Sequence, residues 1–160
     1  MATFRDADSV GQIDYIPVMH SIHRLSGICT PANVAYSPDE LAHQLKSSGA
    51  KVLFTCAAVL DCALKAAKAV GIPEDKIFLL EVPGAALDGS FKTVDDLVEL
   101  GRSSPEVDSL VWSKGQGARQ PAFLCYSSGT SGLPVCFYPG FRGKLFAILG
   151  PSAPVGFVCD

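Results

Sequence analysis

Hydrophobic residues in the first half of the chain recur at helical spacing in some segments and form continuous runs in others. Between residues 14 and 25, apolar positions are three or four residues apart, which predicts a helix with one buried stripe. The continuous runs at residues 52–56 and 77–82 predict strands that are covered on both faces. A shorter run at residues 28–30 ends at Pro31. Helices and strands are therefore both expected.

Local signals mark the ends of two further helices. Ser37 is placed as an N-cap, with Pro38 at the first helical position and Glu40 completing a capping box, and Gly49 then ends the helix. The next apolar stripe, with the spacing of a helix, ends at Gly71. Each of these two helices follows a strand candidate, so strands and helices alternate.

The alternation continues as far as residue 126. Thr93 and Asp96 predict the capped start of a short helix that ends at Gly101. A polar connection over residues 103–120 then leads to a further strand at residues 121–126. Strands that alternate with helices imply right-handed crossovers and parallel pairing. We therefore expect an α/β fold, with a parallel sheet and flanking helices.

The overall composition narrows the class of protein. The chain has 160 residues, of which 48% are hydrophobic, and a formal net charge of −3. This supplies enough burial for one folded domain and argues against intrinsic disorder. Lys and Arg number 13 against 16 Asp and Glu, without a basic run, which argues against binding to nucleic acid or to an anionic membrane surface.

The six cysteines are expected to be reduced thiols. None of them stands in a C-x-x-C pair, and the acidic start of the chain is unlike a secretory leader. The most apolar late stretch, residues 145–158, is interrupted by two prolines and is shorter than the roughly 18–20 residues that cross a bilayer. We therefore expect a cytoplasmic protein without a membrane span.

Residues 127–132 follow the last predicted strand and consist only of serine, threonine and glycine. Small residues let backbone N–H groups approach phosphate oxygens, and hydroxyl groups add further donors. The segment is not a Walker A loop, because the required lysine is absent. From the residues alone, two interpretations stay open: a phosphate-binding loop, or a plain turn rich in serine and glycine.

The nine residues from Tyr126 to Pro134, YSSGTSGLP, resemble the phosphate-loop signature of the adenylate-forming superfamily, the AMP-dependent synthetases and ligases. Segments upstream of it, from Gly11 onwards, resemble 4-coumarate–CoA ligase-like acyl-CoA synthetases. The resemblance implies that ATP phosphates are contacted by this loop. The implied binding residues are Ser127, Ser128, Gly129, Thr130, Ser131 and Gly132.

The same resemblance implies a two-step reaction. A carboxylic acid attacks the α-phosphate of ATP and releases pyrophosphate, and the thiol of CoA then displaces AMP from the acyl-adenylate. The implied cofactors are ATP, Mg²⁺ and CoA, and the implied substrate is a small-molecule carboxylic acid. For a full-length relative, a peroxisomal location is also compatible with this activity.

The chain departs from the family pattern after Pro134. Relatives continue with Lys-Gly, whereas this chain continues with Val135 and Cys136, so a cation that would neutralise phosphate charge is missing. The segments that hold adenine, ribose and Mg²⁺ in relatives have no counterpart, nor has the small C-terminal domain with its catalytic lysine. No catalytic and no metal-binding residue is therefore assigned.

These differences predict two parts of unequal character. Residues 1–134 are expected to be an incomplete N-terminal AMP-binding domain that ends in the phosphate loop. Residues 135–160 lack a sustained hydrophobic period and form a tail outside the family. Because Val-Cys is what a common intron-donor hexamer encodes in frame, we interpret this tail as translated intron sequence.

Two functional hypotheses follow. In the first, the chain is a truncated, inactive portion of an acyl-CoA ligase. In the second, it is a non-catalytic remnant that binds nucleotide or acts through association, for instance by self-association through exposed sheet edges.

Other polar or reactive residues receive structural interpretations. His20 and His23 are expected on a helix surface or at an interface rather than as metal ligands. Asp14 is expected to cap the first helix. Cys56 and Cys62 are expected to be buried as small hydrophobic residues.

Overall fold

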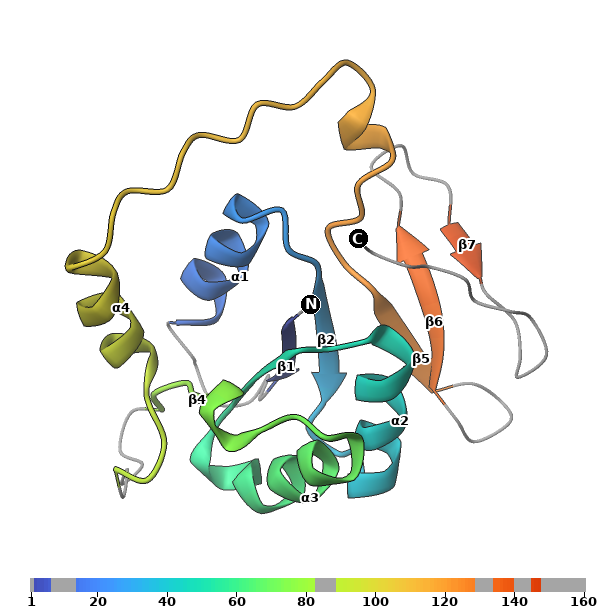
Figure 1. Cartoon of the computed structure of the whole chain (residues 1–160). Coiled ribbons are helices and arrows are strands. Elements are labelled where there is room, and N and C mark those ends of the chain that lie inside the picture. Colours follow the sequence, from blue (N-terminus) through green and yellow to red (C-terminus); the bar gives the residue numbers. More distant parts are fainter. Residues whose placement is uncertain (1, 7–13, 83–88, 129–133, 140–144, 148–160) are drawn as a thin grey trace.

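The computed structural model describes residues 2–6, 14–82, 89–128, 134–139 and 145–147. Over these ranges the chain forms a four-stranded parallel sheet and a three-stranded antiparallel sheet (Figure 1). The parallel sheet has the order β2-β1-β3-β4, and its strands are β1 (Ala2–Asp6), β2 (Cys29–Asn33), β3 (Val52–Thr55) and β4 (Ile77–Leu79). Helices pack on both faces of this sheet, which confirms the predicted α/β fold.

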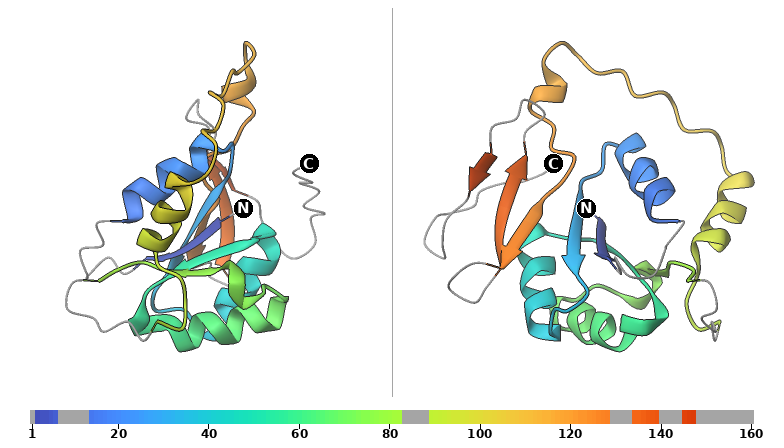
Figure 2. Two further views of the ribbon diagram at one scale, coloured as in Figure 1. Left: turned by 60° about the vertical axis from the view of Figure 1, so that its left-hand side comes forward. Right: turned by 180° about the vertical axis from the view of Figure 1, so that it is seen from behind.

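The parallel sheet separates two apolar layers, because neighbouring strand residues point to opposite faces. Leu53 of β3 packs in one layer and Phe54 in the other. Helices lie on both sides of the strands (Figure 2). Those of the first layer are α2 (Pro38–Ser48) and α3 (Leu60–Val70), and those of the second are α1 (Tyr15–Arg24) and α4 (Val94–Arg102).

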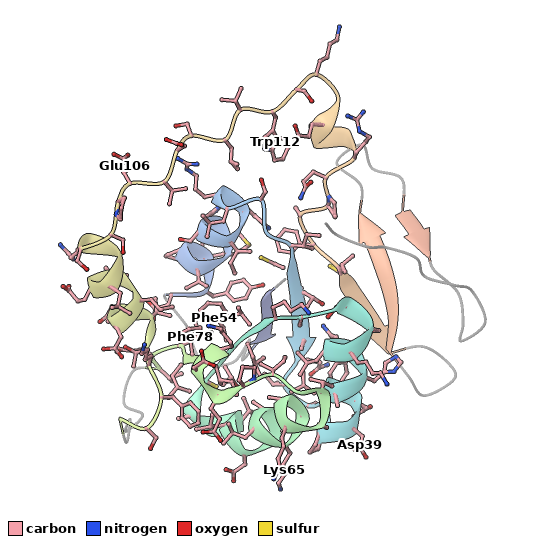
Figure 3. All side chains as sticks on the ribbon, in the orientation of Figure 1. Asp39, Phe54, Lys65, Phe78, Glu106 and Trp112 are labelled. Carbon is pink, nitrogen blue, oxygen red and sulfur yellow. The ribbon has the colours of Figure 1, made fainter. Side chains whose placement is uncertain are left out.

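The two layers differ in size. Buried residues of the first layer are Ala32, Leu41, Leu45, Ala50, Leu53, Ala63, Ala66, Ala67, Ile72 and Ile77. Those of the second layer are Val18, Cys29, Phe54, Leu80 and Val94. Figure 3 shows Phe54 and Phe78 close together within the second layer, and their ring centroids are 5.5 Å apart.

The start of α2 has the predicted capping box. The backbone N–H of Glu40 donates to the hydroxyl of Ser37 (3.4 Å), and the backbone N–H of Ser37 donates to the Glu40 carboxylate (2.8 Å). Gly49 ends the helix in the left-handed conformation, with φ of 67°. The helix that follows β3 is also confirmed, and a 3₁₀ turn at Ala57–Val59 precedes it.

Two expectations about the other helices need correction. Asp14 occupies the N-cap position of α1, but its side chain makes no capping bond and instead accepts the backbone N–H of Glu81 at 3.4 Å. The capping box of Thr93 and Asp96 is confirmed, yet α4 continues through Gly101 to Arg102. A helical glycine costs only about 1 kcal/mol, so Gly101 alone does not end the helix.

Strand boundaries also differ from the prediction. β2 runs past Pro31 to Asn33, because an edge strand tolerates proline where one side needs no ladder hydrogen bond. β4 ends at Leu79 rather than at residue 82. β1 was not indicated by the hydrophobic pattern, although it pairs with both β2 and β3 inside the sheet.

The antiparallel sheet consists of β5 (Cys125–Ser128), β6 (Pro134–Pro139) and β7 (Leu145–Ala147). The expected parallel strand at residues 121–126 is therefore wrong in part. Only Phe123 forms a parallel bridge, with Cys29, and from Cys125 onwards the chain pairs with β6 instead. The segment after Pro134 also contains strands that its aperiodic sequence did not predict.

A long connection joins α4 to β5, and we call its residues 103–115 the strap. The strap contains no helix or strand, and a 3₁₀ turn at Gln116–Ala118 follows it. The Arg24 guanidinium donates to the backbone carbonyls of Val107 (3.0 Å) and Asp108 (2.7 Å), which ties the strap to the end of α1. Among the described residues, no helix combines the length and hydropathy that crossing a membrane requires.

Candidate functional site

The predicted phosphate loop begins in the last residues of β5 and continues towards β6 in the sequence. Ser127 and Ser128 are the last two residues of β5, and Ser128 pairs with Pro134 at the start of β6. Gly129, Thr130, Ser131 and Gly132 lie outside the described residues, and the assignment of all six loop residues to phosphate stays a prediction. Three contacts hold the strand that leads into the loop.

The first of these contacts joins this strand to β2 of the parallel sheet. The backbone N–H of Cys29 donates to the carbonyl of Ala122 (2.9 Å), and the N–H of Leu124 donates to the carbonyl of Cys29 (2.8 Å). These two bonds form the parallel bridge between Cys29 and Phe123. Burial raises the pKa of the Cys29 thiol to about 12, so the thiol stays protonated, and its Sγ donates to the carbonyl of Met19 (4.0 Å).

His23 of α1 adds a second contact at the same place. Its Nε2 lies 3.0 Å from the carbonyl oxygen of Ala122. Because a carbonyl oxygen only accepts, Nε2 carries the proton and donates. The imidazole also packs edge-to-face on Phe123, with ring centroids 4.9 Å apart. His23 therefore fixes an interface between α1 and the strand, in agreement with its structural interpretation.

Tyr126 provides a third contact, one residue before the loop. Its hydroxyl lies 2.6 Å from the hydroxyl of Ser47 in the last turn of α2. Ser47 carries no signal in the sequence, because nothing local to it shows which strand lies beside the helix. The same holds for the contact of His23 with Ala122.

The chain between the strap and β5 is held to the end of α1. The side-chain amide of Gln120 donates to the carbonyl of Ser26 (3.1 Å). These two residues line a cavity of about 40 Å³, together with Gly27 and Trp112. A cavity of this size has room for water but not for a nucleotide.

A larger hollow of about 500 Å³ lies beside α4. Its lining includes Lys92, but also Asp96 and Glu99, whose carboxylates repel phosphate. Hydrogen bonds from the backbone and hydroxyl of Thr93 hold the pKa of Asp96 below its ordinary value, so this carboxylate is ionised at neutral pH. This hollow is therefore unsuited to ATP phosphates.

Within the described ranges, no three His, Cys, Asp or Glu side chains lie close enough together to hold a metal ion. Cys29, Cys56, Cys62 and Cys125 are free thiols, and Cys56 is buried while Cys62 is half-buried. Burial raises the pKa of Cys125, so β5 brings no thiolate charge towards the loop.

Comparison with solved structures identifies the fold. The structure matches the anthranilate CoA ligase AuaEII in complex with anthranoyl-AMP with a TM-score of 0.67 and 19% identity, covering 87% of this chain and 24% of that one. It matches the luciferase-like enzyme of the mealworm Zophobas morio with a TM-score of 0.65 and 16% identity, covering 88% and 30%. The fold is that of the N-terminal domains of adenylate-forming enzymes.

Sequence comparison then identifies the family. Residues 12–135 match the family described as AMP-binding enzyme, and the chain belongs to this family. It is 34% identical over 156 residues to acyl-CoA ligase cm3C of Cordyceps militaris, and 40% identical over 127 residues to acyl-CoA ligase AFT1-1 of Alternaria alternata.

Coverage differs between the two partners of each alignment. The matches cover 93% and 78% of this chain but only 24% and 22% of the two ligases. The chain thus spans about a quarter of the length of the curated relatives it matches. The alignment with cm3C covers too much of the chain to stop at residue 135, so it extends into the segment 135–160.

Proposed function

We propose that residues 12–135 form the phosphate-loop part of an ATP-dependent acyl-CoA ligase, and that a polypeptide of these 160 residues does not complete the reaction alone. The observation that carries the proposal is the YSSGTSGLP segment, which joins β5 to β6 in a chain with the fold of adenylate-forming enzymes. The proposed substrates of the whole enzyme are a carboxylic acid, ATP and CoA.

In the proposed reaction, a carboxylate oxygen forms a bond to the α-phosphorus of ATP while the bond to pyrophosphate breaks. The sulfur of CoA then attacks the acyl carbon, AMP leaves with the electron pair of the broken bond, and the thiol proton passes to solvent. The loop holds the β- and γ-phosphates through backbone N–H groups and hydroxyls, so its contribution is positioning and charge stabilisation.

Val135 is the residue that limits this contribution. A hydrogen bond to a charged partner contributes about 1.5–3 kcal/mol, and valine supplies none of it at the position where the family resemblance implies lysine. We therefore propose that the chain binds ATP weakly, through neutral donors. Weak binding of ATP without turnover is also what the alternative, a non-catalytic nucleotide-binding module, would show.

The experiment measures ATP binding and acid-dependent pyrophosphate exchange with the purified chain. We expect no exchange, weak saturable binding of ATP, and an affinity gain of roughly tenfold or more in Val135→Lys. Thr130→Val removes one loop hydroxyl and is expected to weaken binding. Ser104→Ala is the matched control, because its hydroxyl bonds the carbonyl of Leu100 in α4.

Either of two results would overturn part of this proposal. Pyrophosphate exchange by the unmodified chain would show that residues 1–160 are sufficient for adenylation. A lack of ATP binding in both the unmodified chain and Val135→Lys would remove the phosphate-loop assignment.

The origin of residues 135–160 stays a separate proposal. The family match ends at residue 135, which supports translated intron sequence, while the alignment with cm3C extends further. Sequencing of the mature transcript decides whether residues 135–160 are translated intron sequence or part of the mature coding sequence. A message that joins Pro134 to a Lys-Gly continuation supports the intron, and a message that retains all 26 codons as its sole species rejects it.

Self-association through sheet edges is the second candidate function. Each edge strand of the parallel sheet already has a one-residue bridge, between Cys29 and Phe123 at β2 and between Leu79 and Thr93 at β4. The remaining edge positions are proposed to pair with a second copy. Size-exclusion chromatography with light scattering measures this, and a monomer at all accessible concentrations contradicts it.

A further inference from the structure

The strand that carries the phosphate loop changes partners just before the loop. Residues 122–124 are bonded to β2 of the parallel sheet, whereas from Cys125 the backbone pairs antiparallel with β6. Backbone pairing with β6 sets the direction of β5, and side-chain contacts with other elements add to it. Ser127 and Ser128 pair with Val135 and Pro134 of β6, and residues 125 and 126 before them set where this pairing begins.

The bond between Tyr126 and Ser47 lies at this place. The two hydroxyl oxygens are 2.6 Å apart, and Ser47 Oγ also lies 3.3 Å from the carbonyl oxygen of Gln44. Because that carbonyl only accepts, Ser47 donates to it and Tyr126 donates to Ser47. The three groups form a chain of hydrogen bonds that runs from the exposed Tyr126–Ser47 pair to the backbone of α2.

The far end of this chain is anchored in the parallel sheet. Gln44 is fully buried, and its side-chain amide donates to the hydroxyl of Thr30 and to the carbonyl of Pro31, both at 2.8 Å. Leu41 and Leu45 bury the same helix against the first apolar layer. α2 therefore provides a rigid point between β2 and β5, to which Tyr126 is attached.

We propose that Ser47 and Tyr126 are positioning residues for the polyphosphate of ATP, acting by fixing the backbone of Ser127 and Ser128. This inference rests on the proposed function and identifies what orders its loop. Donors that are held in place before binding lose less conformational freedom when the ligand arrives. Since the bond orders only the loop that contacts phosphates, its loss weakens the binding of ATP and of inorganic tripolyphosphate equally.

The experiment measures dissociation constants for ATP and for tripolyphosphate in the unmodified chain and in the Val135→Lys background. Ser47→Ala and Tyr126→Phe each remove the bond, and we expect each to weaken binding of both ligands by about 2- to 10-fold. The double variant is expected to be no weaker than the single variants, because both remove the same bond.

Controls separate positioning from loss of stability. Ser48→Ala removes a neighbouring hydroxyl that bonds the carbonyl of Leu45 within α2, and we expect unchanged affinity. Ser47→Thr keeps the hydroxyl and is expected to restore binding. Hydrogen exchange at the amides of Ser127 and Ser128 is expected to be faster in Ser47→Ala, while the unfolding midpoint without ligand stays the same.

The possible outcomes are distinct. Unchanged affinity in Ser47→Ala and Tyr126→Phe, in a chain that binds ATP, overturns this inference and leaves the proposed function intact. An equal loss in Ser48→Ala also overturns it, because the effect would then belong to α2 as a whole. Absence of ATP and tripolyphosphate binding in both backgrounds overturns the proposed function and this inference with it.

Discussion

The two faces of the parallel sheet are built differently. Under α2 and α3, leucine, isoleucine and alanine side chains from both helices and the strands form a closed layer. On the other face, α1, α4 and the strap leave large apolar side chains in contact with solvent. In the described ranges, these exposed side chains are Ile16, Leu25, Val98, Leu100, Val107, Leu110, Val111 and Trp112.

The difference shows where stability resides. Burial of apolar area is the main stabilising contribution, so the layer under α2 and α3 contributes most of it. The other face relies more on polar contacts, such as those of His23 with Ala122 and of Arg24 with the strap. Val111 is 90% exposed and contributes little burial. The candidate site is thus connected to the closed layer by the contact of Tyr126 with Ser47 in α2. The residues before it are connected to the open face by the contact of Ala122 with His23 in α1.

The largest expected difference concerns leucine side chains of the two faces. Leu45 is 1% exposed in α2, and Leu45→Ala is expected to lower the free energy of unfolding by about 2–5 kcal/mol, because it leaves a cavity. Leu100 is 51% exposed in α4, so Leu100→Ala is expected to change it by less than about 0.5 kcal/mol. Urea unfolding followed by circular dichroism measures both values. Equal losses would contradict the difference between the faces.

Two glycines on the open face are expected to respond in opposite directions. A Cβ added at Gly27 would lie 2.6 Å from Ile22 Cγ2 and 2.9 Å from the Ile22 carbonyl oxygen, so Gly27→Ala is expected to destabilise by about 1–3 kcal/mol. Gly101 lies in α4 with open space around it, and Gly101→Ala is expected to stabilise by up to about 1 kcal/mol. Thermal unfolding of both variants checks the signs. A neutral effect of Gly27→Ala would contradict the close contact between residue 27 and Ile22.

The capping boxes compare one helix from each face. Removing a cap costs about 0.5–2 kcal/mol, and Ser37→Ala is expected to reduce global stability by such an amount, since α2 belongs to the closed layer. For Thr93→Ala, we expect the main effect to be local, as faster hydrogen exchange within α4. Native-state hydrogen exchange distinguishes local from global opening. Uniformly faster exchange in Thr93→Ala would show that the open face is as cooperative as the closed one.

Acid is expected to weaken both capping boxes. Hydrogen bonds from the backbone and hydroxyl of Ser37 hold the pKa of Glu40 below its ordinary value of 4.5. A lowered pKa in the folded chain stabilises it above that ordinary value, and the stabilisation is lost as pH falls through the folded pKa. Unfolding measured from about pH 6 to about pH 3 is therefore expected to show declining stability, with a smaller decline in Glu40→Gln. An identical decline in both chains would exclude Glu40 as a contributor.

The smallest expected effect concerns Arg24. Arg24→Lys replaces a guanidinium group, which donates to two carbonyls of the strap, by a single ammonium group. We expect the free energy of unfolding to change by less than about 0.5 kcal/mol, because these bonds are exposed. Trp112 lies on the strap and is the single tryptophan, so stronger quenching of its fluorescence by acrylamide reports a looser strap. Unchanged quenching would show that Arg24 does not hold it.

Local signals account for the parts of the fold that the sequence predicts well. The capping residues Ser37 and Thr93 act within one turn of helix, and the left-handed turn at Gly49 needs only its own residue type. The strand at residues 52–55 is buried on both faces, so its apolar run is continuous. In each case the cause lies within a few residues.

Features that depend on distant partners could not be predicted in this way. β1 is only five residues long and ends in Arg5 and Asp6, and its pairing on both sides makes it a strand. The antiparallel pairing of β5 depends on β6, whose sequence shows no alternation of apolar and polar residues. For the candidate site, composition and the family resemblance predict the loop, but the contact between Ser47 and Tyr126 follows from how α2 lies against β5.

The central place of β1 has a consequence for the order of folding during synthesis. Ala2 pairs with Cys29 on one side and with Val52 on the other, so a strand that leaves the ribosome before both neighbours has to wait for them. Its backbone N–H and C=O groups stay without sheet partners until β2 emerges, and the second side waits longer for β3. Such non-local pairing slows folding and exposes strand edges to aggregation. The rate at which β2 and β3 emerge therefore sets how long the nascent chain is vulnerable to aggregation.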